Sequence, residues 1–357
     1  MAENNHGIKK LADSEFVQKR RNGLARQGRE GCCIKEYGGY LELEQFHGRE
    51  YHENSIALNC GRGALAYLIQ ARKIREIALP YFLCGSVAET CRRLKVHIRY
   101  YHITEDFMPA EGACGDEFFY AVNYYGQVGQ DAMGTLAGRC PGRLIADYAQ
   151  AFFEKPASTG ADTLYTCRKF FGVADGAYLY TDKCEEQDGL PLDESFARMG
   201  YVLGRYERTA SEFYKEFAEN NDFFSDEPVR KMSKLTRNLL KGIDYDAVRH
   251  RRTGNFRYLH ERLRNVNKLA IDIPEGPFMY PLYVKGGNRI REKLRMEKIY
   301  IPVLWPDVFK ICRAGDLEYD MAENILPLPV DQRYTEKDME YICSRVERHL
   351  GKTGGMQ

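Results

Sequence analysis

Residues 144–176 read LIADYAQAFFEKPASTGADTLYTCRKFFGVADG. The apolar run over 143–146 is typical of a buried strand, and it ends at Asp147. A second apolar run, over 163–167, leads to Lys169. Parallel strands of an α/β sheet place their functional groups just beyond their C-terminal ends. If these two strands are neighbours, Asp147 and Lys169 face the same crevice.

A carboxylate that faces a lysine in an apolar setting suits pyridoxal 5'-phosphate, abbreviated PLP. The lysine forms a Schiff base with this cofactor, and the carboxylate pairs with its pyridinium nitrogen. Each residue also has a simpler interpretation, because a strand-end Asp is usually a helix cap and a Lys beside an Arg is usually surface charge. The neighbours Phe170, Phe171 and Val173 favour a functional Lys169, since desolvation lowers the pKa of an amine.

A glycine-flanked turn offers a place for the phosphate. Residues 55–60 are typical of a strand and lead into Gly61, Arg62 and Gly63, after which residues 64–72 keep helical spacing. The unpaired amides and the dipole at a helix N-terminus favour an anion, and glycine lets the backbone come close to it. Taken alone this signal is weak, because many such turns only redirect the chain.

Composition excludes several classes of protein. The 357 residues include 52 Lys+Arg and 51 Asp+Glu, without long charged blocks, so neither a nucleic-acid site nor a membrane surface is indicated. The polar N-terminus predicts no secretory signal, and no apolar run is long enough to span a membrane. The 11 cysteines are scattered without a C-x-x-C pair, which indicates reduced thiols, a cytoplasmic location and no metal site.

Strand-like and helix-like segments alternate between residues 55 and 147, which predicts a mostly parallel sheet wrapped by helices. In this region we expect further strands at 76–79, 96–100 and 118–123 and helices at 85–94 and 131–137. After Tyr180 the pattern becomes helical, over 194–220, 229–240 and 244–264. Within the last of these, the basic residues Arg249, His250, Arg251 and Arg252 are interpreted as a solvated face.

A smaller α+β part follows a boundary rich in proline and glycine. We expect its strands at 278–284, 300–303 and 324–328 and its helices at 289–298 and 335–349. The predicted organisation is therefore an N-terminal segment (1–50) that packs on the large domain, a large cofactor-binding domain (51–270) and a small C-terminal domain (271–357).

Five stretches resemble the DegT/DnrJ/StrS family of PLP-dependent sugar aminotransferases, and the resemblance covers roughly residues 50–350. LNCGRGAL (58–65) is similar to the family's phosphate turn, and VNYYGQ (122–127) to its strand-end tyrosine-glycine motif. IADYAQAF (145–152) is similar to its acid-x-x-Gln motif, and YTCRKFFGVADGA (165–177) to its Schiff-base segment. ILPLPVDQRYTEKDMEYI (325–342) resembles the C-terminal signature.

This resemblance implies a type I PLP-dependent aminotransferase fold, with a seven-stranded, mostly parallel sheet in the large domain, a small domain and a homodimer. It implies a transaminase that moves an amino group, usually from glutamate, to a keto-sugar nucleotide. Asp147 is expected on the pyridine nitrogen, Gln150 near the ring hydroxyl, and Lys169 on the cofactor's aldehyde carbon.

The chain departs from the family pattern at three places. Leu164 occupies the place of a phosphate-binding serine, for which Thr166 is the expected substitute. Cys84 occupies the place of the aromatic residue that stacks on the ring, with Tyr81, Phe82 or Tyr125 as replacements. The segment that reaches the partner's cofactor is best matched by residues 231–240, with Ser233 and Arg237.

Two alternatives stay open beside transamination. Another PLP reaction such as dehydration is disfavoured by Lys169, because a histidine replaces the lysine in the related dehydratases. A non-catalytic PLP-fold protein with a regulatory or scaffolding role remains, because Cys84 and Leu164 are unusual at their positions.

Overall fold

The structure is a computed structural model that describes residues 37–110, 112, 114–157, 160–183 and 189–353. Met1–Glu44 and Gln45–Gln357 form separate units, and the fold described below is that of the second unit. Most of the predicted N-terminal segment, residues 1–36, lies outside the described residues. Within the described part, no helix has the length and hydropathy needed to cross a membrane.

A seven-stranded sheet forms the centre of this unit. Its strand order is β1-β7-β6-β5-β4-β2-β3, and the strands are β1 (Ile56–Leu58), β2 (Glu76–Pro80), β3 (His97–Tyr101), β4 (Phe118–Val122), β5 (Leu144–Asp147), β6 (Ala161–Thr166) and β7 (Ala177–Tyr180). Only β7 runs antiparallel to its neighbours, β6 and β1. The expected mostly parallel, seven-stranded sheet is confirmed.

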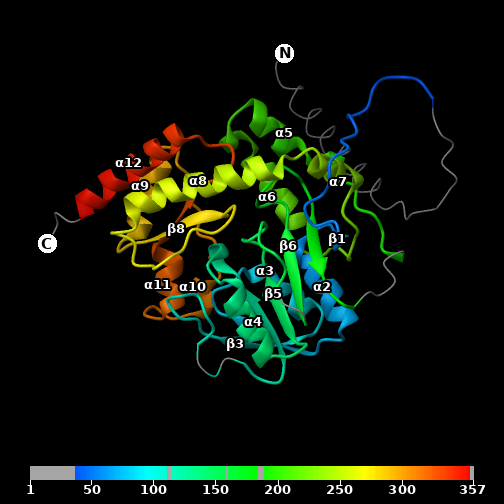
Figure 1. Ribbon diagram of the computed structural model, residues 1–357, viewed down its shortest axis with the longest axis horizontal. Helices are drawn as coiled ribbons and strands as arrows, with labels where there is room; N and C mark the ends of the chain where they lie inside the picture. The colour runs from blue at the N-terminus through cyan, green and yellow to red at the C-terminus, as the bar shows by residue number, and fades with distance from the viewer. Residues whose placement is uncertain (1–36, 111, 113, 158–159, 184–188, 354–357) are drawn as a thin grey trace, which may run out of the picture. The chain divides into compact units, whose positions relative to one another are not determined.

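Helices cover both faces of the sheet. The helices α2 (Gly61–Ala71) and α3 (Gly85–Arg93) contact each other, and α4 (Gln130–Arg139) follows β4. Crossovers between parallel strands are right-handed. Helix α3 connects β2 to β3, toward one edge of the sheet, and α4 connects β4 to β5, toward the other edge. The two helices therefore lie on opposite faces (Figure 1).

The helical region after β7 is more broken than the sequence predicts. It contains η3 (Phe196–Arg198), α5 (Gly200–Glu207), η4 (Ala210–Phe213), α6 (Tyr214–Phe223), α7 (Lys234–Lys241) and α8 (Tyr245–Leu263). The continuous helix expected over 194–220 is wrong, because Thr209 and Glu212 form a capping box that starts a new segment. The helix expected from residue 229 begins only after Ser233, whose side chain caps it.

The C-terminal part contains a two-stranded antiparallel sheet of β8 (Met279–Tyr283) and β9 (Ile325–Pro329). Its helices are α9 (Gly287–Met296), α10 (Val308–Ile311), α11 (Leu317–Asn324) and α12 (Glu336–Thr353). The strand expected at 300–303 is wrong, because this segment is irregular. Pro302 lacks the N–H that a ladder needs, and the flanking Ile299 and Ile301 are buried without strand pairing.

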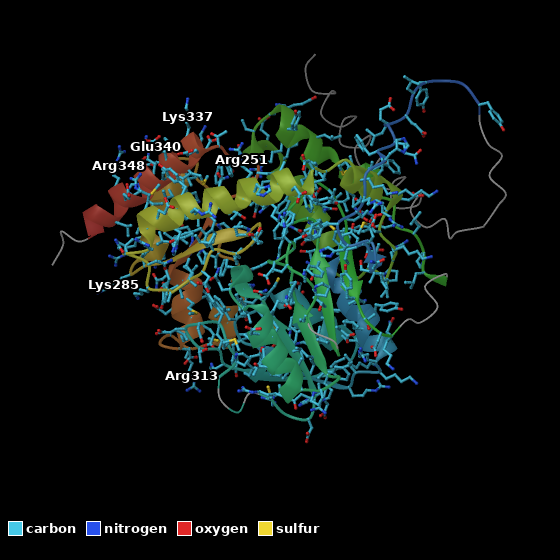
Figure 2. All side chains as sticks on the ribbon, viewed as in Figure 1. Arg251, Lys285, Arg313, Lys337, Glu340 and Arg348 are labelled. Carbon is cyan, nitrogen blue, oxygen red and sulfur yellow. The ribbon has the colours of Figure 1, made fainter. Side chains whose placement is uncertain are left out.

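The buried side chains form two clusters. The first surrounds the seven-stranded sheet, and the second lies between α8, the small sheet, α9 and α12. Figure 1 shows α8 beside α9 and α12, and the charged Lys337, Glu340 and Arg348 lie on the exposed side of α12 (Figure 2). The division into domains at residue 271 stays a prediction, and Phe256, Leu259 and Leu263 of α8 belong to the second cluster.

Glu154, in the segment after β5, has a partly buried carboxyl group. Asn123 Nδ2 donates a hydrogen bond to Glu154 Oε2 (3.2 Å). Burial nevertheless raises the pKa of Glu154 from 4.5 to about 7. The folded chain therefore favours the protonated acid, and the resulting stability is present below the unfolded pKa and lost as the pH rises through the folded pKa.

Glu154→Gln is accordingly expected to raise the free energy of unfolding by up to about 3 kcal/mol at about pH 8, because the amide stays neutral. At about pH 5 the two proteins should differ far less. Urea denaturation at both pH values measures this difference, with Glu340→Gln on the exposed side of α12 as the matched control. Equal stability of Glu154→Gln and the wild type at the higher pH would contradict the prediction.

Candidate active site

The neighbouring strands β5 and β6 bring the predicted catalytic residues to one edge of the sheet. The two strands are parallel, with Asp147 at the end of β5 opposite Leu164 of β6. Thr166 ends β6, and Lys169 follows three residues later. Burial raises the pKa of Asp147, and the positive charge of Lys169 opposes this rise. The structure thus places both residues at one edge of the sheet, and their catalytic roles stay a prediction.

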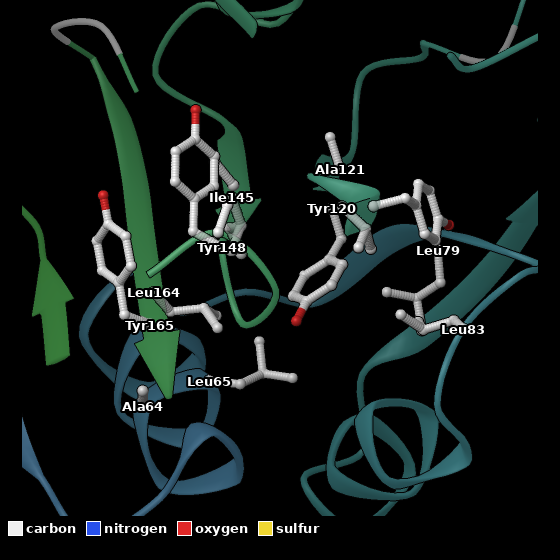
Figure 3. Close-up of a cluster of buried hydrophobic side chains, with 14 of the residues drawn as sticks. Ala64, Leu65, Leu79, Leu83, Tyr120, Ala121, Ile145, Tyr148, Leu164 and Tyr165 are labelled. Carbon is white, nitrogen blue, oxygen red and sulfur yellow. The ribbon is translucent and has the colours of Figure 1, made fainter. Parts of the chain in front are cut away.

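Asp147 is a buried carboxylate that two donors hold in place. Tyr120 donates its hydroxyl proton to Asp147 Oδ2 (2.8 Å), and the Ala149 amide donates to Oδ1 (2.8 Å). Burial raises the pKa of Asp147, and Lys169 and these two hydrogen bonds oppose that rise. Figure 3 shows Tyr120 pointing from β4 to the side of the sheet where Leu65 of α2 and Leu164 lie.

Lys169 is exposed, whereas the apolar residues that follow it are buried. Its Nζ lies 5.5 Å from the centre of the Phe278 ring, in cation–π geometry. The side chains of Phe170, Phe171 and Val173 pack into the first hydrophobic cluster. The prediction that these neighbours desolvate Lys169 is wrong for the single chain, because they turn inward while the amine stays accessible.

The N-terminus of α2 lies against the end of β6. A Cβ atom on Gly61 would come within 2.9 Å of Thr166 Cγ2, so a residue without a side chain allows this close approach. Cys60 caps the helix, and its Sγ accepts a hydrogen bond from the Gly63 amide (3.2 Å). Because this cap uses the Gly63 amide, the amides of Gly61 and Arg62 are the ones left for an anion.

Two arginines make the start of α2 electropositive. Burial raises the pKa of the Cys60 thiol, and the Gly63 amide and the charges of Arg62 and Arg168 oppose this rise. Arg62 Nη1 donates to the carbonyl oxygen of Asn221 (3.0 Å), and Arg168 donates to the side-chain oxygen of Asn221. Among the described residues, the buried Nε of Arg168 has no hydrogen-bond partner. The N–H group at Arg168 Nε could therefore donate a hydrogen bond to a bound anion.

The remaining predicted cofactor contacts lie nearby but have partners within the chain. Gln150 Oε1 accepts a hydrogen bond from the Tyr125 amide (2.8 Å) and holds Tyr125 at a φ of 55°. Cys84 is exposed at the N-cap of α3, with its Sγ 3.1 Å from Ser86 Oγ. Burial raises the pKa of Tyr120 well above its usual value, and Asp147 and Cys84 add to this rise.

The expected substitutes for missing family residues are mostly used for packing. Phe82 and Tyr125 are buried, with ring centres 4.2 and 5.9 Å from that of Trp305. Ser233 donates to the buried Asp175, and Arg237 pairs with Glu50. Tyr81 is partly buried between Tyr100 and His102.

Sequence reasoning missed Tyr120 and Arg252. Tyr120 lies inside an apolar strand, where the pattern gives no sign of a polar role. Arg252 was expected on a solvated face with its neighbours, but its side chain is only 1% exposed. Its spacing from Asn255, Phe256 and Leu259 places it on the buried stripe of α8, and this 3.6-residue periodicity was the available signal.

Known proteins were compared with this chain. No protein-family profile matches it, and no curated protein resembles it at a significant level. A DegT DnrJ EryC1 StrS aminotransferase from Brucella abortus superposes with a TM-score of 0.56 at 16% identity, covering 83% of this chain and 85% of that chain. The sugar aminotransferase CalS13 from Micromonospora echinospora gives a TM-score of 0.54 at 14% identity, covering 83% and 87%.

NtdA from Bacillus subtilis, solved with bound cofactor PMP, gives a TM-score of 0.57 at 14% identity, covering 85% of this chain and 78% of that chain. This chain has the aminotransferase fold. The predicted type I architecture is therefore confirmed. In an aminotransferase fold, as in other open α/β sheets, ligands bind beyond the carboxyl ends of the parallel strands. Asp147 and Lys169 lie at this edge of the sheet.

Proposed function

We propose that this chain is a PLP-dependent transaminase of the DegT/DnrJ/StrS type. The proposed reaction moves an amino group, with glutamate as donor, to a keto-sugar carried on a nucleotide. The observation that carries the proposal is geometric: the buried Asp147 ends β5, Lys169 follows the neighbouring parallel strand β6, and the end of β6 lies against the glycine start of α2. We further propose a cytoplasmic homodimer with the division into large and small domains at residue 271.

The residues present fit the cofactor. The amides of Gly61 and Arg62, with the Thr166 hydroxyl beside them, would hold the phosphate, and the partnerless Arg168 Nε is consistent with an anion there. Asp147 would pair with the ring nitrogen. Gly63, Cys84 and Gln150 are proposed as further cofactor contacts around these groups.

Bound PLP would supply an aldehyde that condenses with amines and a ring that accepts electrons from the reacting carbon. Lys169 would bind the cofactor covalently and, once released, move a proton between carbon atoms of the substrate and the cofactor. Asp147 would keep a proton on the ring nitrogen. Tyr120 and the Ala149 amide orient the Asp147 carboxylate for this role.

A non-catalytic PLP-fold protein with a regulatory or scaffolding role is the second candidate. It is favoured by Cys84, an exposed thiol at the proposed ring-stacking position, and by Leu164 at the proposed serine position. Neither residue can reproduce the contact that the family pattern provides. Both candidates can bind the cofactor, so turnover must be measured as well to separate them.

The test is an absorbance scan of the protein supplied with PLP. We expect a band near ~420 nm that borohydride removes by fixing the cofactor on Lys169. Glutamate should abolish this band, and a panel of keto-sugar nucleotides should then identify the acceptor that restores it. A band that glutamate and every acceptor leave unchanged would favour the non-catalytic candidate, and no band at all would contradict cofactor binding.

A further inference from the structure

Arg252 of α8 connects the C-terminal part of the chain to the backbone beside Lys169. Its Nη2 donates a hydrogen bond to the carbonyl oxygen of Phe170 (3.1 Å), the residue directly after the lysine. Its guanidinium also lies 4.6 Å from the centre of the Phe170 ring. Arg252 thus fixes both the backbone and the ring of this residue.

Gln332, in the turn between β9 and α12, supplies a second donor to the same oxygen. Gln332 Nε2 lies 2.8 Å from the Phe170 carbonyl oxygen, and Gln332 Oε1 accepts from Arg252 Nε (2.8 Å). Asn255 donates to the carbonyl oxygens of Val330, Asp331 and Tyr334, which holds the turn that carries Gln332. The two donors therefore support each other.

Arg252 also reaches the second element that contacts the lysine. Its Nη1 donates to the carbonyl oxygens of Pro277 (2.9 Å) and Phe278 (3.4 Å). The ring of Phe278 lies under Lys169 Nζ. One guanidinium is therefore hydrogen-bonded to the backbone of Phe170, which follows Lys169 in the chain, and of Phe278, whose ring contacts the Lys169 amine.

Arg252 makes a directional set of hydrogen bonds to three segments of the chain. Arg252 is a buried cation whose hydrogen-bond acceptors are all uncharged: three carbonyl oxygens and the Gln332 side chain. Burial lowers the pKa of Arg252 to about 10, so the side chain is still charged at neutral pH. Loss of Arg252 would leave these buried acceptors without their donor, which lowers stability. Only a planar fork of donors sets several carbonyl groups in fixed directions.

We propose that Arg252 and Gln332 are positioning residues that hold the Lys169 amine in its reactive direction. This inference rests on the function proposed above. Fixing the Phe170 carbonyl fixes the peptide that follows Lys169, and a misplacement of about 1 Å by a residue remote from the chemistry can lower turnover by about 10²-fold.

The experiment compares Gln332→Met and Arg252→Met with the wild type, and Arg251→Met is the matched control. Arg251 is the preceding residue on α8, and its side chain is exposed (Figure 2). For Gln332→Met we expect kcat to fall by about 10-fold and for Arg252→Met by about 10²-fold, with KM changed by less than about 3-fold. The pH midpoint of the ~420 nm band should shift in both variants and stay unchanged in Arg251→Met.

A readout without cofactor accompanies these measurements. Hydrogen exchange of the amides at residues 169–171 should be faster in both variants and normal in the control. Folded Arg252→Met and Gln332→Met proteins with wild-type kcat and spectral pH midpoint would overturn the inference, even with a lower Tm. If Arg252→Met does not fold, Gln332→Met decides alone. A wild type without the band would instead refute the proposed function, so the two failures are distinct.

Discussion

Lys169→Ala is expected to lower turnover by about 10⁴-fold or more, because it removes both the group that binds the cofactor covalently and the group that moves the proton. The side chain is exposed, and its loss removes the contact with the Phe278 ring and the attraction to Asp147. The folded structure should therefore persist. Steady-state kinetics with the acceptor identified by the spectral screen measures the effect.

Lys155→Ala, at another exposed lysine, is the control and should keep wild-type turnover. After borohydride treatment in the presence of PLP, mass spectrometry should find the added mass on Lys169 in wild type and none in Lys169→Ala. A variant that kept turnover within about 10-fold of wild type would assign the reactive amine to another residue.

Asp147→Asn is expected to lower turnover by about 10³-fold while PLP still binds through its phosphate. A close ion pair at an intermediate effective dielectric is worth about 4 kcal/mol, and each 1.4 kcal/mol corresponds to about a tenfold change in rate. The asparagine amide would hold no proton on the ring nitrogen, so the ring would accept electrons poorly. Turnover and a PLP-binding titration on the same sample measure the two effects separately.

The same change also has a predictable effect on stability, which must be separated from catalysis. Both neighbours of Asp147, the Tyr120 hydroxyl and the Ala149 amide, are donors, but an asparagine offers only one acceptor oxygen. If this oxygen keeps the Ala149 amide, the NH₂ group can donate to Tyr120 Oη, but the buried Tyr120 hydroxyl proton then loses its acceptor, at a cost of about 1–3 kcal/mol. The double variant Asp147→Asn with Tyr120→Phe should recover part of this stability but no turnover. Wild-type turnover in Asp147→Asn would show that the carboxylate has no role at the ring.

The sheet, and the edge of it at which Asp147 and Lys169 lie, were readable from the sequence for physical reasons, while the chemical roles of the two residues stay a prediction. Each parallel strand is an apolar run bounded by a turn or helix signal, and such runs at 76–79, 118–123 and 143–146 correspond to β2, β4 and β5. Asp147 and Lys169 follow strands, where side chains at the same edge of a sheet meet. The sequence predicts a glycine turn that can approach an anion, whereas the close approach of Gly61 to Thr166 is visible only in the structure.

The parts that escaped prediction depend either on contacts between distant segments or on local helix caps. The segment at 300–303 has strand composition, but it pairs with no strand, and of its side chains Ile301 packs into the second cluster while Tyr300 is exposed. The broken helices after β7 depend on local caps that a long helical pattern hides. Arginine is usually a surface residue. Arg252 can be buried because distant segments supply acceptors for its guanidinium, namely Phe170, Pro277, Phe278 and Gln332.

Helix α8 lies before residue 271 in sequence, but its apolar side chains belong to the second cluster. A fragment that stopped at residue 270 would keep Phe256, Leu259 and Leu263 without the strands and helices that cover them, so this surface would favour aggregation. The fragment would also lack Gln332, and the Phe170 carbonyl would lose one of its two side-chain donors. The N-terminal portion is therefore a poor choice for isolated expression, and attempts to exchange C-terminal portions between related chains should carry α8 with them.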